Sequence, residues 1–338
     1  MADRRTGFSG RALPLMLVAP QILVTLLFFV WPAVQGVYTS FFLDQGFGGN
    51  RAFVGFGNYA ELFADPLYLQ SFVTTLVFSA AVTVLAIGIA LVLALAANRV
   101  VRGALGYRSM LIWPYAVAPA LAGVIWYFLL NPSVGVLANW YDAVAPAANA
   151  ALDGLTGAPA GATGAETGAE TGAETAASAD PGWWAWLRLP EEWNHYTDGR
   201  QAMALVIIAS VWKQVSYNFL FFLAGLQSIP RSLIEAAAMD HAGPWRRFWS
   251  ITLPLLSPTT FFLLVVNIVY AFFDTFATIH ATTSGGPAQA TTTLVYQVYR
   301  AYESTDYSGS AAQSVVLMGL VIGMTMIQFR YVERRVVY

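Results

Sequence analysis

The sequence has no cysteine among its 338 residues and only one lysine, Lys213. The absence of cysteine excludes a disulfide framework, thiolate metal sites and thiol redox chemistry. Charged residues make up 11% of the chain, whereas a soluble domain carries about a quarter. The histidines, His195, His241 and His280, are too far apart in sequence to predict a metal or catalytic cluster. A net charge of −2 excludes a broad basic surface for nucleic acid.

Hydrophobic residues account for 57% of the chain and gather in long runs. A membrane-spanning helix needs roughly 20 mostly apolar residues, and six runs meet that length. They cover residues 13–42, 72–97, 107–130, 202–226, 258–280 and 311–329. The first run is too long for a signal peptide and no small-residue cleavage site follows it. The sequence therefore predicts an all-α membrane protein with six transmembrane helices in residues 13–338.

Arginine lies mainly in alternate loops, which fixes an expected orientation because basic loops stay in the cytoplasm. The basic set is Arg4, Arg5, Arg11, Arg99, Arg102, Arg108, Arg231, Arg246, Arg247, Arg330, Arg334 and Arg335. The opposite loops hold only Arg51, Arg188, Arg200 and Arg300. Both termini of this multi-pass protein are therefore predicted to be cytoplasmic, with residues 1–12 as a cytoplasmic tail.

The longest external loop, residues 131–200, contains the low-complexity stretch "GATGAETGAETGAETAASADPGWWAW". Its glutamates recur every four residues, but glycine and like-charge repulsion oppose a helix, so disorder is predicted. A calcium site is disfavoured because the alternating Asp or Asn ligands are missing. Trp183, Trp184 and Trp186 fit either an aromatic belt at the membrane surface or packing within the loop.

Residues 228–257 form a polar module between two apolar runs. Within it, "IEAAAMDHAGPWRRFWSITLPLLSP" begins with an alanine-rich helix-forming stretch that "DHAGP" interrupts. A second short helix then offers Phe248 and Ile251 on an apolar face. The segment is either an ordinary cytoplasmic loop or, as its exposed aromatic residues favour, a surface offered to a partner.

Polar residues in the fourth and fifth runs predict a translocation pathway. Lys213 and Asp274 are the ionisable residues deep within the runs, where charge is costly and usually functional. The first polar stripe comprises Ser210, Lys213, Gln214 and Tyr217, and the second comprises Asn267, Tyr270 and Asp274. The alternative is a Lys213–Asp274 ion pair, and interhelical hydrogen bonding is the favoured role of Asn218 and Asn267.

The polar module resembles the EAA motif of permease subunits in binding-protein-dependent ABC importers. The matching residues are Glu235, Ala236, Ala237, Asp240, Ile251, Leu253 and Pro254. In that family the motif is a coupling helix that docks on the cytoplasmic ATPase. Family members usually carry glycine where this chain has His241. Either His241 adopts a positive φ with some strain, or Gly243 forms the turn in its place.

Further segments, among them "WPYAVAPALAGVIW", "SVWKQVSYNFLFFLAGLQSIPRSLIEAAA" and "TSGGPAQATTTLVYQVYR", resemble the carbohydrate-uptake branch that includes A-type permeases of sn-glycerol-3-phosphate importers. The resemblance implies the type I importer permease fold in the bacterial inner membrane, a second permease subunit, an ATPase dimer and an external solute-binding protein. ATP and magnesium would belong to the ATPase, since the chain has no phosphate loop and no catalytic or metal site of its own.

The same resemblance implies that the 214–217 and 272–275 regions face the solute, and that the "SGGP" turn lies near the binding protein. The implied solute is sn-glycerol-3-phosphate or a glycerophosphodiester, with a neutral oligosaccharide as the alternative. A membrane enzyme would need an acidic or histidine cluster that the sequence does not offer. A channel would leave the EAA motif unexplained.

Overall fold

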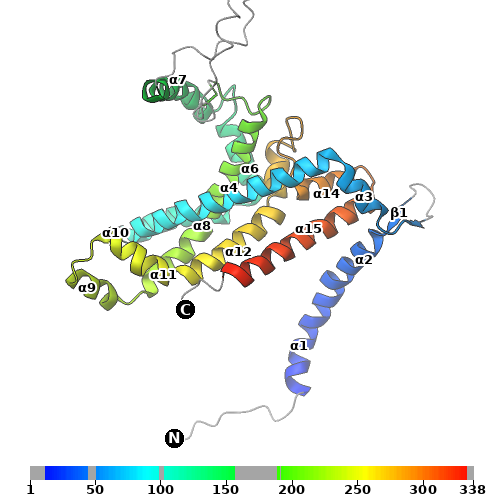
Figure 1. Cartoon of the computed structure of the whole chain (residues 1–338), viewed down its shortest axis with the longest axis horizontal. Coiled ribbons are helices and arrows are strands. Elements are labelled where there is room, and N and C mark those ends of the chain that lie inside the picture. The colour runs from blue at the N-terminus through cyan, green and yellow to red at the C-terminus, as the bar shows by residue number, and fades with distance from the viewer. Residues whose placement is uncertain (1–11, 45–50, 99–102, 157–188, 191, 333–338) are drawn as a thin grey trace, which may run out of the picture. The chain divides into compact units, whose positions relative to one another are not determined.

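The computed structural model describes residues 12–44, 51–98, 103–156, 189–190 and 192–332, and helices dominate it (Figure 1). In chain order they are α1 (Ala12–Thr25), the π-helical η1 (Leu26–Val30), α2 (Trp31–Thr39), α3 (Gly57–Ala64), α4 (Pro66–Ala97), α5 (Ala104–Ile112), the 3₁₀ turn η2 (Trp113–Ala116), α6 (Pro119–Leu129), α7 (Val136–Thr156), α8 (Gly199–Ser228), α9 (Arg231–Met239), α10 (Pro244–Arg247), the π-helical η4 (Phe248–Thr252), α11 (Leu253–Leu255), α12 (Ser257–Phe273), α13 (Phe276–Thr282), α14 (Leu294–Glu303), α15 (Tyr307–Ile327) and the π-helical η5 (Gln328–Val332).

The prediction of an all-α chain needs a small correction. Strands β1 (Phe42–Asp44) and β2 (Arg51–Phe53) pair antiparallel, with Phe42 opposite Phe53. The side chain of Asn58 donates to the backbone carbonyls of Ser40 and Phe42 and so ties the ribbon to α3. The ribbon lies at the end of the first apolar run, which the sequence analysis extended to residue 42.

Four helical stretches are continuous and apolar enough to span a membrane: Met16–Thr39, Pro66–Ala97, Gly199–Ser228 and Tyr307–Tyr331. The predicted third and fifth spans appear as bent pairs. Gly106–Ala116 and Pro119–Leu129 meet at 104°, and Pro244–Leu255 and Ser257–Phe273 meet at 65°. The described residues thus hold four spans, or up to six if each bent pair counts as one. The predicted run 258–280 also breaks after Phe273, before α13 begins.

Local chemistry explains several helix starts. Pro66, Pro119 and Pro244 each open a helix, where proline is favoured because the first N–H has no partner within that helix. Asp65 accepts the Leu67 N–H at 2.9 Å and caps α4. Asp306 caps α15 in the same way by accepting the Gly309 N–H at 2.8 Å.

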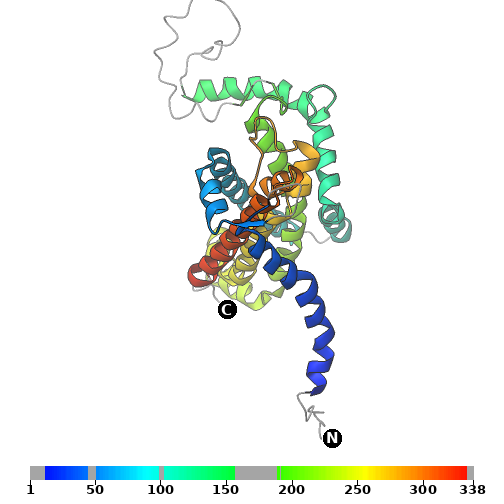
Figure 2. The same cartoon turned by 90° about the vertical axis from the view of Figure 1, so that its right-hand side faces the viewer.

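The chain divides into two compact units, one of which comprises residues 1–80, 229–276 and 292–338. In this unit α15 packs against α2, α3, α12 and α14 (Figure 2). Its apolar core is formed by Leu62, Tyr68, Phe272, Leu294, Leu317 and Val321. The Thr75 hydroxyl of α4 accepts the Leu294 N–H at 2.8 Å and satisfies the buried start of α14.

The second unit comprises residues 81–228 and 277–291. Here α8 packs against α5, η2 and α6, and α6 contacts α7. Helix α7 lies inside the predicted external loop 131–200 and was not anticipated. Its inner side joins a core of Leu130, Ala138, Trp193 and Leu205. The GAET repeats and Trp183, Trp184 and Trp186 lie outside the described residues.

Candidate functional site

Lys213 lies on α8 and donates hydrogen bonds to two backbone carbonyls in the bend between η2 and α6. The distances from its Nζ are 3.0 Å to the Tyr115 oxygen and 2.8 Å to the Val117 oxygen. The ammonium also lies over the Tyr115 ring, 5.2 Å from its centroid. A charge placed in an apolar span is therefore solvated by carbonyl dipoles and an aromatic face.

The predicted polar face of α8 is real but varies in burial. Gln214 and Asn218 are buried, whereas Tyr217 is half-buried and packs its ring 5.4 Å from that of Tyr115. The Ser210 hydroxyl is buried and has no hydrogen-bond partner within the described residues. Among the predicted pathway residues of this unit, Lys213 and Tyr217 are thus the more accessible pair.

The predicted residues of the fifth span lie in the other unit. Asn267 is fully buried, and its amide donates to the Leu263 carbonyl of its own helix at 2.7 Å. Tyr270 is buried, while Asp274 is exposed at the break that follows α12. Because Lys213 and Asp274 belong to different units, their ion pair stays a prediction.

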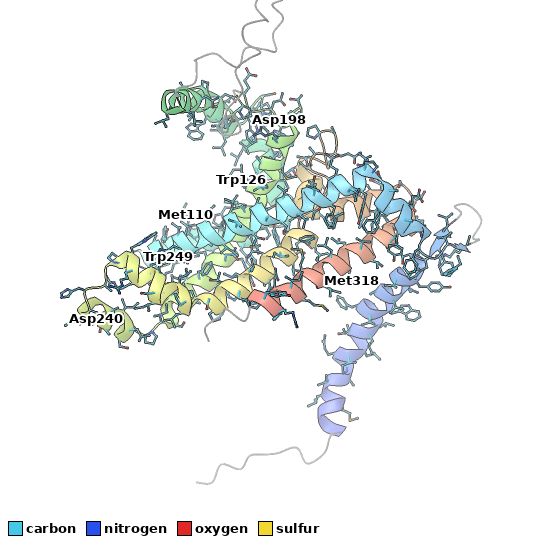
Figure 3. The ribbon with its side chains drawn as sticks, in the orientation of Figure 1. Met110, Trp126, Asp198, Asp240, Trp249 and Met318 are labelled. Atoms are coloured by element: carbon cyan, nitrogen blue, oxygen red, sulfur yellow. The ribbon has the colours of Figure 1, made fainter. Side chains whose placement is uncertain are left out.

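Residues 231–255 form a helical hairpin, the predicted coupling module. Glu235 and Ala236 are exposed on α9, Ala237 is half-buried, and Asp240 is exposed at the helix end. Several large apolar side chains of the module also lie at its surface (Figure 3). They are Leu233, Met239, Trp245 and Trp249, with Met239 81% exposed. An apolar surface on so polar a segment is typical of a docking site.

His241, at the position where family members usually carry glycine, adopts the left-handed conformation in the turn between the module's helices. His241 has a φ of +53°, and the Ala242 N–H donates to the Ala237 carbonyl at 3.0 Å. This six-to-one bond closes a Schellman-type helix end with His241 in the left-handed position. Gly243 has a φ of −62°. The alternative in which Gly243 takes over the turn is therefore wrong.

The "SGGP" turn is held in a tight, cross-linked loop. The Thr283 and Thr291 hydroxyls are 2.6 Å apart, and Thr291 also donates to the Gly286 carbonyl at 2.9 Å. Residues with positive φ within it include Ser284, Ala288 and Gln289. His280 is exposed in the last turn of α13, where its backbone carbonyl accepts the Ser284 hydroxyl. Backbone strain of this kind is retained only where the surrounding structure fixes it.

A polar cluster that was not predicted from the sequence anchors the segment before α8. The Asp142 carboxylate of α7 accepts the Trp193 N–H at 2.6 Å, and the Gln201 amide oxygen accepts the Asn194 N–H. Figure 3 marks Asp198 at the start of α8, where its carboxylate accepts the Arg200 N–H. His195 is buried beside the Tyr127 ring, and that burial lowers its pKa. The amphipathic pattern of residues 136–149 was the sequence feature that could have predicted α7, which carries Asp142.

Within the described residues no group of three or more His, Cys, Asp or Glu side chains is arranged to hold a metal ion. Several candidate membrane spans, a polar face on one of them and an exposed helical hairpin are the features of a membrane transport permease.

Comparison with known proteins identifies the family to which the chain belongs. Residues 193–338 match the family described as the binding-protein-dependent transport system inner membrane component. The "sn-glycerol-3-phosphate transport system permease protein UgpA" of Rhizobium meliloti (strain 1021) is 47% identical, covering 99% of each chain. The protein of the same name from Yersinia pestis bv. Antiqua (strain Antiqua) is 48% identical, covering 100% of each. The chain therefore belongs to the family of binding-protein-dependent inner-membrane permeases of ABC importers.

The fold agrees with solved transporters of this type. A bacterial ABC transporter involved in the import of the acidic polysaccharide alginate superposes with a TM-score of 0.68 and 20% identity, covering 95% of this chain and 96% of that one. The same transporter type in complex with an alginate pentasaccharide-bound periplasmic protein gives a TM-score of 0.66. These likenesses establish the ABC importer permease fold.

Proposed function

We propose that this chain is the permease subunit that forms half of the translocation pathway in an ATP-driven importer of sn-glycerol-3-phosphate or glycerophosphodiesters. The observation that carries the proposal is the 47–48% identity, along essentially the whole chain, to permeases of sn-glycerol-3-phosphate transport systems. The other half of the pathway would come from a second permease subunit.

The pathway proposal rests on the polar face of α8 and the broken fifth span. Lys213 carries a positive charge beside Tyr217, and a phosphate-bearing solute is drawn to such a charge without needing one fixed geometry. Gln214 extends that face, and Asp274 offers hydrogen-bond acceptors for hydroxyl groups. Tyr270, Asn218 and Asn267 are buried, which supports a role in holding the helices that line the route.

The coupling proposal rests on the hairpin of residues 231–255. Its exposed Met239, Trp245 and Leu233 suit a docked surface, with Glu235 and Ala236 beside them. The partner would be the dimeric ATPase, which binds ATP and magnesium. With both termini and this hairpin in the cytoplasm, the rigid loop around Gly286 would lie outside, where a solute-binding protein docks.

Uptake by the reconstituted importer tests the proposal. The chain, its second permease and the ATPase would be placed in vesicles with the cognate binding protein and ATP. Uptake of labelled sn-glycerol-3-phosphate or glycerophosphodiester is expected, with no uptake of a neutral oligosaccharide. Calorimetry on the binding protein with the same solutes gives an independent measurement. Uptake of the oligosaccharide alone would contradict the proposed solute class.

A further inference from the structure

The bend in the third span leaves backbone carbonyls without their usual helical partners. In a continuous helix the Tyr115 carbonyl would accept the N–H of residue 119, but Pro119 has none. Val117 is extended, with φ −75° and ψ +131°, which turns its carbonyl away from the helical path. Inside a membrane an unsatisfied carbonyl is costly, so the bend needs hydrogen-bond donors from elsewhere.

Lys213 supplies those donors from a different helix. Its Nζ lies 3.0 Å from the Tyr115 oxygen and 2.8 Å from the Val117 oxygen, the carbonyls on either side of the turn. The neighbouring Trp212 packs against both limbs of the bend. Its ring centroid lies 5.7 Å from that of Trp113 in η2 and 6.2 Å from that of Trp126 in α6.

We propose that Lys213 is a positioning residue that fixes the bend of the third span by donating to the Tyr115 and Val117 carbonyls, which the break before Pro119 takes out of the helical hydrogen-bond pattern. The same contacts hold Tyr115 against Tyr217, whose rings are 5.4 Å apart. Any effect of this bend on solute transport rests on the proposed function. Its effect on stability does not, because the hydrogen bonds of Lys213 hold the bend whatever the solute is. Stability and transport can therefore be measured separately.

A double-variant experiment on the complete reconstituted importer tests the assignment. Lys213→Met should lower the Tm of the complex, since one exposed and one part-buried charge-assisted hydrogen bond are lost. Pro119→Ala restores an N–H, so that on loss of Lys213 the turn could relax toward a continuous helix in which residue 119 donates to the Tyr115 carbonyl. In that background the same Lys213→Met change should lower the Tm by about half as much. Lys213→Arg keeps donors in place and should retain most of the stability.

Pro146→Ala is the matched control, because it also removes a proline from a helix but lies in α7. In the Pro146→Ala background, Lys213→Met should lower the Tm as much as it does in the wild-type background. Solute-stimulated ATP hydrolysis should show a reduced kcat for Lys213→Met, and a partial return of kcat with Pro119→Ala. The proposed attraction of Lys213 for a phosphate-bearing solute is a separate role, which a raised KM would report.

Equal Tm losses in both proline backgrounds would overturn the assignment. A normal Tm with raised KM would also overturn it, while leaving the proposed importer function in place. If Pro119→Ala fails to assemble, the Lys213→Arg variant tests the assignment by itself. A Tm for Lys213→Arg that is as low as that of Lys213→Met would then overturn the assignment. Failure of the proposed function would be seen separately, because sn-glycerol-3-phosphate would then not stimulate ATP hydrolysis by the wild-type importer.

Discussion

The left-handed turn at His241 predicts that glycine at this position stabilises the coupling module. A left-handed conformation costs an L-residue roughly 1–2 kcal/mol, and His241 holds it with φ +53°. Glycine removes that cost but loses about 0.5–1 kcal/mol through the greater freedom of the unfolded chain. His241→Gly should therefore stabilise the end of α9 by about 0.5–1 kcal/mol.

Hydrogen exchange of the α9 amides in the assembled importer measures this effect. A gain of that size slows local opening about two- to fivefold. His241→Asn is the matched control, because asparagine also tolerates the left-handed region, and it should change little. His241→Val should speed exchange, because a β-branched residue fits this conformation poorly. Equal exchange rates in the glycine and valine variants would refute the role assigned to the turn.

Three further predictions concern other parts of the chain. Ala237→Asp should reduce association with the ATPase dimer while the spans still insert, because it places a charge in the proposed docked surface; normal complex yield on affinity purification would argue against that surface. Deletion of residues 164–175 should leave assembly and transport nearly intact, since loop shortening changes closure entropy little; lost uptake by an assembled deletion variant would mean that the segment binds a partner. Burial lowers the pKa of His195, so the unfolded chain takes up a proton near pH 6.5 before the folded one does. The segment around His195 should therefore lose stability as the pH falls through that value, and His195→Phe should remove this dependence in proteolysis assays from pH 7.5 to about pH 5.

The sequence predicted the second, fourth and sixth spans well because each is one uninterrupted apolar helix. The third and fifth were harder, since a hydropathy run does not show where a chain changes direction. Pro119 marked the break in the third span, but only the fold shows that the two helical segments meet at 104°. Helix α7 was not predicted because the glycine-rich GAET repeats of the same loop oppose a helix, while the helix-forming pattern lies in the earlier part of the loop.

The role of Lys213 shows why site residues are harder to predict than spans. Its place on the polar face of α8 was visible in the sequence, together with Gln214 and Tyr217. Its hydrogen-bond partners are backbone carbonyls almost 100 positions earlier in the chain, and any residue type presents a carbonyl. By contrast, the strain at His241 could be anticipated, because the position demands a backbone conformation that side-chain type affects.

The length of α4 has a consequence for the membrane around this protein. Its 32 residues would extend about 48 Å, while the hydrocarbon core of a bilayer is about 30 Å thick. Tilting alone would require an inclination near 50°, beyond the usual range for such helices of about 0–40°. The apolar run 72–97 alone extends about 39 Å and would fit at a tilt near 40°, so the first turns of α4, with Gln70 and Ser71, would reach the headgroup region. Hydrophobic mismatch thus makes acyl-chain length a physical variable for this protein, independent of its solute.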